Sequence, residues 1–228
     1  MSIRNFIPNG LTCLNLLFGC VALIAIFDGR YDEAIYYVIL SGVADFFDGF
    51  AARMLKATSN IGKDLDSLAD LVSFGVVPAF VMFKMIEAHS SSSYMPYLGL
   101  GIAIFSALRL AKFNNDERQS DTFYGLPVPA NALLICALPF LAKEPFFVDL
   151  LSKDWVLVAI SILMSFLLVS DVKLLALKFA NFGWKGNEAR YLVMVISLIA
   201  IATFQVIALP FVILFYFVAS IFTNMLSN

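Results

Sequence analysis

The chain has 228 residues, 61% of them apolar and 14% charged, and its formal net charge is −2 at pH 7. A soluble domain carries roughly 25% charged residues. This composition therefore excludes an ordinary soluble globular protein and indicates one that crosses a membrane several times. No dense basic cluster interleaves with aromatic residues, so we expect no nucleic-acid partner.

Apolar stretches of membrane-spanning length recur along the chain. We predict an all-α integral membrane protein, a polytopic bundle of about eight transmembrane helices in the lipid bilayer. No long polar insertion divides the chain, so residues 1–228 are expected to form a single membrane-embedded domain. The expected spans cover residues 8–27, 33–53, 66–87, 95–113, 127–143, 155–170, 190–208 and 210–226.

Proline marks the two least regular parts of this assignment. Pro129 and Pro139 interrupt the fifth expected span, and a tight turn near Leu209 and Pro210 separates the last two. Because the expected number of spans is even, both termini should lie on the same side of the membrane.

Lysine and arginine are concentrated on one set of connections, and such connections are usually cytoplasmic. We therefore expect both termini and the loop between the second and third spans to face the cytoplasm. Only Arg30, Lys84, Lys143 and Lys153 are expected on the other side. The basic residues expected on the cytoplasmic side are Arg4, Arg53, Lys56, Lys63, Arg109, Lys112, Arg118, Lys173, Lys178, Lys185 and Arg190.

Four aspartates stand at the end of the second expected span and the start of the third. Asp45 and Asp48 are three residues apart, and Asp66 and Asp70 are four apart, so each pair lies on one face of its helix. The two helices are antiparallel neighbours, so the acidic faces can converge. Ionisable residues inside a membrane are costly and indicate a functional site.

Carboxylates this close repel one another unless a cation lies between them. Oxygen ligands favour hard divalent ions, Mg²⁺ or Mn²⁺. Two such ions about 4 Å apart suit phosphoryl transfer. The same acids could instead form the ion pathway of a cation-coupled transporter. Arg53 beside them could bind a phosphate or simply anchor its helix at the cytoplasmic surface.

The acidic segment resembles the signature of the CDP-alcohol phosphatidyltransferase family, whose fixed positions all match with their spacing. The resemblance implies membrane enzymes that move a substituted phosphoryl group from a CDP-linked donor to an alcohol and release CMP. It also implies a homodimer. The matching stretch is Asp45-x2-Asp48-Gly49-x2-Ala52-Arg53-x8-Gly62-x3-Asp66-x3-Asp70.

By this resemblance, Asp45 and Asp66 each contact both ions, while Asp48 binds one and Asp70 the other. Asp70 is also the expected catalytic base for the acceptor hydroxyl. Asn9 and Thr12, in Pro8-Asn9-x2-Thr12, resemble a segment that approaches the CDP group; helix capping by Asn9 or packing by Thr12 is the alternative. The expected CDP-diacylglycerol contacts are Asn9, Thr12, Gly49, Ala52, Arg53, Ser59 and Gly62.

Two later segments bear on the acceptor alcohol. Arg109-Leu-Ala-Lys112-Phe-Asn114 and Gly125-Leu-Pro127-Val-Pro129-Ala-Asn131-Ala resemble segments of bacterial and archaeal phosphatidylserine synthases, with Lys112 and Asn131 departing from the usual residues. A serine acceptor brings a carboxylate, which Arg109 or Lys112 could hold. Its ammonium could contact Asn114 and Asn131. Membrane anchoring is the alternative role of the two basic residues.

These observations together predict transfer of the phosphatidyl group of CDP-diacylglycerol to the hydroxyl of L-serine, which gives phosphatidylserine and CMP. The expected location is a prokaryotic cytoplasmic membrane, with the active site on the cytoplasmic side. A family member that uses glycerol 3-phosphate or inositol is the first alternative. The transporter is the second, and a membrane scaffold that only mediates interactions is the third.

Overall fold

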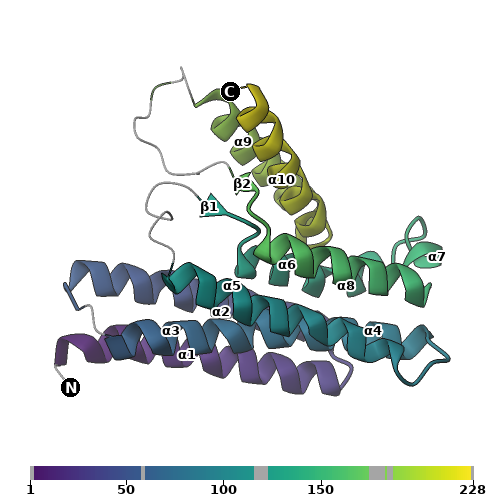
Figure 1. The fold of residues 1–228 in the computed structure, drawn as a ribbon, viewed down its shortest axis with the longest axis horizontal. Helices are drawn as coiled ribbons and strands as arrows, with labels where there is room; N and C mark the ends of the chain where they lie inside the picture. Colours follow the sequence, from purple (N-terminus) through teal and green to yellow (C-terminus); the bar gives the residue numbers. More distant parts are fainter. Residues whose placement is uncertain (1–2, 58–59, 116–122, 175–182, 184–186, 227–228) are drawn as a thin grey trace.

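The computed structural model describes residues 3–57, 60–115, 123–174, 183 and 187–226 (Figure 1). The regular secondary structure of the described part is helical apart from one pair of two-residue strands. Most of the helices run along the long axis of the molecule, whereas the last two are steeply inclined to it (Figure 1). The elements are α1 (Ile3–Phe27), α2 (Tyr31–Met54), α3 (Asn60–Asp70), the π-helix η1 (Leu71–Val76), α4 (Val77–His89), the 3₁₀-helix η2 (Met95–Leu100), α5 (Gly101–Asn115), β1 (Phe123–Tyr124), α6 (Val128–Leu141), α7 (Val148–Leu151), α8 (Asp154–Val169), β2 (Lys173–Leu174), α9 (Glu188–Phe204), the 3₁₀-helix η4 (Gln205–Ile207) and α10 (Ala208–Leu226).

Within the described residues, five helical stretches are long and apolar enough to cross a membrane. The first four correspond to the first four predicted spans. The fifth and sixth predicted spans form the shorter helices α6 and α8. The last two predicted spans correspond to α9 and α10, which η4 links and which together make up the fifth stretch. The five stretches are Phe6–Phe27, Tyr31–Met54, Ile61–His89, Met95–Asn115 and Arg190–Thr223.

Helix α6 is short and lies at the centre of the packing. Its 14 residues correspond to roughly 21 Å of helix, less than the roughly 30 Å hydrocarbon core of a bilayer. Apart from Asn131 it is apolar on all sides, which is typical of a helix surrounded by others. It contacts α2, α4, η1 and α10. Pro127 in extended conformation precedes its first residue, so the sequence Gly125–Pro129 shapes where this helix begins.

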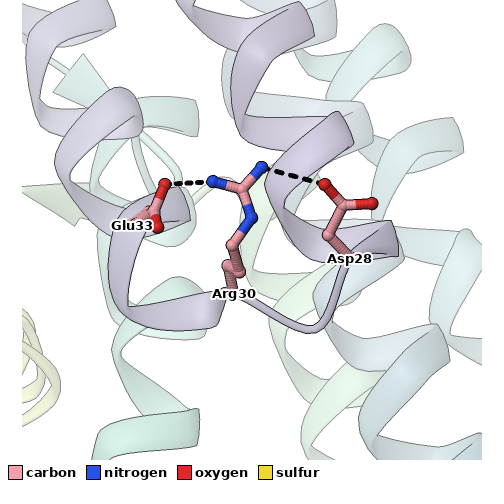
Figure 2. Close-up of polar contacts among 3 residues, drawn as sticks. All are labelled: Asp28, Arg30 and Glu33. Atoms are coloured by element: carbon pink, nitrogen blue, oxygen red, sulfur yellow. Dashed lines mark hydrogen bonds and ion pairs between the residues drawn. The ribbon is translucent and has the colours of Figure 1, made fainter.

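Helices α1 and α2 form an antiparallel hairpin through the turn at residues 28–30. Gly29 has a φ of 74°, a value that glycine adopts without a steric penalty. The guanidinium of Arg30 donates to the carboxylate of Asp28 at 2.9 Å and also to that of Glu33 (Figure 2). All three side chains are exposed, so these ion pairs add little stability. The hairpin brings the N-terminal half of α1 beside the C-terminal half of α2, where two of the aspartates lie.

The third membrane stretch is not a uniform α-helix. The π-helix η1 begins directly after Asp70 and ends where α4 starts. A π-segment changes which face of the helix its following residues occupy, and such segments are frequent at functional sites. Gly75 in this segment packs against α5, since an added Cβ would lie 2.9 Å from the Cβ of Ser106.

The last two helices form a hairpin that contacts the rest mainly through α10, on α6 and β2 (Figure 1). The predicted turn near Leu209 and Pro210 is wrong by a few residues, since the chain reverses at η4 and Pro210 lies in the first turn of α10. Proline is tolerated there because the first-turn N–H groups have no partner within the helix. Many apolar side chains of this hairpin are exposed, as expected of a surface that faces lipid.

Candidate metal centre

Three aspartates from two helices meet at one end of the bundle. Asp45 and Asp48 come from α2 and Asp66 from α3, and each offers a carboxylate oxygen within 4.8 Å of the others. Asp48 is buried, with 5% of its surface exposed, and the other two are half-buried. Three partly buried carboxylates at this separation repel one another unless protons or a cation compensate their charge. This all-oxygen set fits a hard divalent metal ion.

Asp70 lies one helical turn beyond Asp66 on the same helix. It is outside the group of three, but it is close enough to interact electrostatically with all of them. Its Oδ1 accepts a hydrogen bond from Nδ2 of Asn15 on α1 at 3.0 Å. The structure thus brings all four predicted acids to one region, with three in the geometry of a metal site.

Thr12 and Asn9, predicted from the first helix, both line this region. The hydroxyl of Thr12 donates to Oδ2 of Asp48 at 2.6 Å, and its oxygen lies 3.1 Å from the carbonyl oxygen of Pro8. The alternative of helix capping by Asn9 is wrong, because α1 starts at Ile3 and Asn9 lies within it. The Nδ2 of Asn9 is buried without a hydrogen-bond partner among the described residues.

A cavity of about 810 Å³ opens beside the acids, within the size range of ligand pockets. All predicted donor contacts among the described residues line it; Ser59 lies outside those residues. Gly49 lies beside Arg53, and an added Cβ would make an ordinary contact with Nη1 of that arginine at 3.5 Å. The lining residues are Pro8, Asn9, Thr12, Asp45, Phe46, Asp48, Gly49, Ala52, Arg53, Ala57, Gly62, Lys63, Asp66 and Phe113.

A second, apolar groove of about 370 Å³ lies between α2 and α6. Asp45 and Phe46 line both this groove and the larger cavity, so the two spaces adjoin at the acids. All three acids of the centre line the larger cavity, and Asp45 also lines the apolar groove. The remaining groove residues are Val38, Ile39, Gly42, Val43, Phe47, Phe74, Pro129 and Leu133.

Arg109 and Lys112, the predicted basic contacts of the acceptor, have different surroundings. Arg109 on α5 is buried, and its guanidinium carbon lies 5.4 Å from the ring centre of Phe113, which lines the cavity. Lys112 instead reaches Asp171, with 2.7 Å between Nζ and Oδ1.

The two predicted asparagines also lie apart. Asn114 donates to the hydroxyl of Ser67 at 2.7 Å, and both line a separate pocket beside Asp64. Asn131 on α6 is fully buried, and neither polar atom of its side chain has a hydrogen-bond partner within the described part of the chain. The structure therefore does not gather the four acceptor residues into one cluster.

Asn15, Ser41 and Ser73 were not predicted from the sequence. All three are fully buried; Asn15 donates to Asp70, and the two serines donate to the Asn15 carbonyl. Asn15 follows Thr12 by three residues, so the two side chains share a helix face. A polar residue at this spacing inside an apolar span is the signal that could have identified it.

A helical membrane protein with clustered carboxylates beside a large cavity has the features of a metal-dependent enzyme that acts at the bilayer. The family model for CDP-alcohol phosphatidyltransferase matches residues 5–169, and the chain belongs to this family of phosphotransferases. The match covers α1 to α8 and excludes the final hairpin.

Several curated proteins are similar to the chain. The CDP-diacylglycerol–serine O-phosphatidyltransferase of Bacillus subtilis is 36% identical over 141 residues, which are 60% of this chain and 76% of the relative. That of Helicobacter pylori is 29% identical over 168 residues, 73% of this chain and 70% of the relative. That of Methanocaldococcus jannaschii is 31% identical over 174 residues, 75% of this chain and 76% of the relative.

Proposed function

We propose that this enzyme transfers the phosphatidyl group of CDP-diacylglycerol to the hydroxyl of L-serine and releases CMP. The observation that carries the proposal is the centre formed by Asp45, Asp48 and Asp66, which lines the larger cavity and, at Asp45, adjoins an apolar groove. Such a junction suits a substrate with a charged nucleotide head and a lipid tail. The names of the similar proteins support serine as the acceptor.

Two divalent ions, Mg²⁺ or Mn²⁺, would be held by Asp45, Asp48, Asp66 and Asp70. Bound ions would neutralise the charge on the pyrophosphate oxygens and stabilise the departing CMP. The close approach of three carboxylates supports bound cations, because cations would offset the repulsion between these acids. Mn²⁺ and Mg²⁺ both accept an all-oxygen site.

In the proposed reaction, Asp70 accepts the proton of the serine hydroxyl as its oxygen attacks the phosphorus that carries diacylglycerol. A new P–O bond to serine forms while the P–O bond to CMP breaks. A carboxylate is a weak base, but proton transfer needs only to accompany the attack. The partly buried position of Asp70 beside the metal centre supports this role.

The donor would bind with its CDP group in the larger cavity and one acyl chain along the apolar groove. Arg53 at the exposed rim suits the pyrophosphate, since a guanidinium can contact two oxygens of one phosphate. Gly49, Ala52 and Gly62 provide small surfaces against which the nucleotide can pack closely. Asn9 and Thr12 would complete the donor site, with the Thr12 hydroxyl acting through Asp48.

Serine would reach the centre near Arg109, whose guanidinium would hold the serine carboxylate. Lys112, Asn114 and Asn131 are further proposed contacts.

Replacing Arg109 by Lys should raise the KM for serine about tenfold and leave the KM for CDP-diacylglycerol within about twofold, because lysine cannot form a bidentate pair with a carboxylate. Steady-state kinetics with each substrate varied checks this expectation. Equal effects on both KM values would contradict the assignment. Arg30→Lys, the same substitution at the exposed turn between α1 and α2, is the matched control and should change neither KM.

We further propose one membrane domain over residues 1–228, with eight crossings if α6, α8, α9 and α10 each cross the bilayer. Both termini and the metal centre would face the cytoplasm, since most basic residues flank that end. The bacterial and archaeal sources of the similar proteins support a prokaryotic cytoplasmic membrane. A homodimer completes the proposal.

The test is an acceptor assay with the purified enzyme, CDP-diacylglycerol and Mg²⁺ or Mn²⁺. Serine, glycerol 3-phosphate and inositol are added separately, and CMP and the lipid product are measured. We expect CMP and phosphatidylserine with serine alone. Turnover with another alcohol would replace the acceptor, and ion flux in sealed vesicles without any turnover would favour the transporter.

A further inference from the structure

One face of α1 reaches two of the four acids. Thr12 donates to Asp48 on α2, and Asn15, three residues later, donates through Nδ2 to Oδ1 of Asp70 at the end of α3. Asn15 is fully buried, as is typical of a residue whose neighbours fix its side-chain conformation. Helix α1 thus hydrogen-bonds acids that come from two different helices.

The backbone carbonyl of Asn15 is also hydrogen-bonded to neighbouring elements. Its carbonyl oxygen accepts a hydrogen bond from Ser41 Oγ of α2 at 3.1 Å and another from Ser73 Oγ of the π-helix at 3.0 Å. Gly19, one turn further along α1, lies against the same π-helix, since an added Cβ would be 3.0 Å from the Cα of Ser73. Asn15 is therefore fixed relative to the segment that follows Asp70.

Stability alone does not account for this asparagine. Its Oδ1 is buried without a hydrogen-bond partner among the residues that the structure describes. A buried polar atom left unsatisfied is destabilising, and an apolar residue of the same shape would avoid that cost. The remaining contribution of the amide is its hydrogen bond to Asp70.

We propose that Asn15 is a positioning residue for Asp70, an inference that rests on the proposed function. The amide engages Oδ1 and holds the carboxylate in one orientation, so that Oδ2 is the oxygen available to the metal centre and the acceptor hydroxyl. A neutral donor orients the carboxylate without neutralising it, as partners of metal ligands commonly do.

The experiment compares Asn15→Leu with the wild-type enzyme. Leucine keeps the approximate volume and removes the donor. Because loss of such an orienting partner typically costs about 10–100-fold in activity or metal affinity, we expect kcat to fall by that factor. The KM for CDP-diacylglycerol should stay within about twofold. The change in Tm should be small, because Oδ1 of Asp70 loses a donor while the unsatisfied Oδ1 of Asn15 is also removed. The control is Ser161→Ala, which removes a fully buried hydroxyl that donates to the Leu157 carbonyl within α8, and it should leave kcat unchanged.

A second measurement does not depend on turnover. Titration with Mn²⁺, followed by electron paramagnetic resonance without lipid substrate, should show weaker binding in Asn15→Leu than in wild type, by about tenfold. Asn15→Gln, which keeps an amide donor on a longer side chain, should recover part of both kcat and Mn²⁺ affinity. The same criteria apply to Asn15→Ala if leucine is not accommodated.

The outcomes separate this inference from the proposed function. Wild-type protein that turns over no acceptor would overturn the function, while the Mn²⁺ titration would still test the role of Asn15. Unchanged kcat and Mn²⁺ affinity in Asn15→Leu would overturn the positioning role. A loss of kcat that merely parallels a loss of Tm would also overturn it, because it would assign Asn15 to packing.

Discussion

Asp70→Asn is expected to reduce turnover about a thousandfold while CDP-diacylglycerol binding changes less than about threefold. Asparagine matches the carboxylate in shape but cannot accept the proton of the acceptor hydroxyl, and loss of a general base costs about 10²–10⁴ in rate. Donor binding should persist because Asp45, Asp48 and Asp66 remain as a compact group of oxygen ligands. Single-turnover CMP release and equilibrium donor binding measure the two quantities separately.

The matched control is Asp64→Asn on the same helix. Asp64 is exposed and lines the separate pocket beside Ser67 and Asn114. Since the two substitutions remove the same charge from α3, a general electrostatic effect would reduce turnover in both. Near-normal turnover of Asp70→Asn, or equal losses in the two variants, would contradict the role of Asp70 as base.

The acidic centre was predictable because a few rules of local geometry suffice for it. Spacings of three and four residues align Asp45 with Asp48 and Asp66 with Asp70, and a short connection makes α2 and α3 neighbours. The cost of charge in a membrane identifies these residues as functional without further information. The convergence of three carboxylates confirms that part of the prediction.

The surroundings of Asp70 were not predictable in the same way. The π-helix that follows Asp70 packs against other helices, as at Gly75 and Ser106, and no local sequence pattern predicts it. Asn15 contacts Asp70 across 55 positions of sequence, so its role depends on how α1 is seated. Hydrophobic periodicity predicts which residues are buried but not which buried polar groups meet.

The number of membrane spans was difficult to predict for a related reason. Apolar composition alone does not distinguish a membrane-facing helix from one enclosed by others. Helix α6 is apolar apart from the buried Asn131, and it packs against α2, α4 and α10. The surroundings of the predicted acceptor residues were also not predictable from composition, since Lys112 forms an ion pair with Asp171, which is distant in sequence. Pairwise contacts between distant segments decide such cases.

Removal of divalent metal is expected to abolish turnover, with activity below about 0.1% of the starting value after exhaustive chelation. The proposed reaction builds charge on the departing phosphate, and the centre opposes this charge with carboxylates unless cations are bound. Re-addition of Mg²⁺ or Mn²⁺ should restore turnover. Ca²⁺ should restore much less, because it favours more ligands and longer bonds than Mg²⁺. CMP release after chelation and re-addition provides the measurement.

The carboxylates should control this metal dependence. Asp66→Asn should raise the Mn²⁺ concentration needed for half-maximal turnover at least about tenfold, because it removes one charged ligand from the compact group. Asp149→Asn on α7, an exposed acid outside the group, should not change it. If turnover survived exhaustive chelation, protons would have to neutralise the clustered acids, and their close approach would then no longer support metal-assisted phosphoryl transfer.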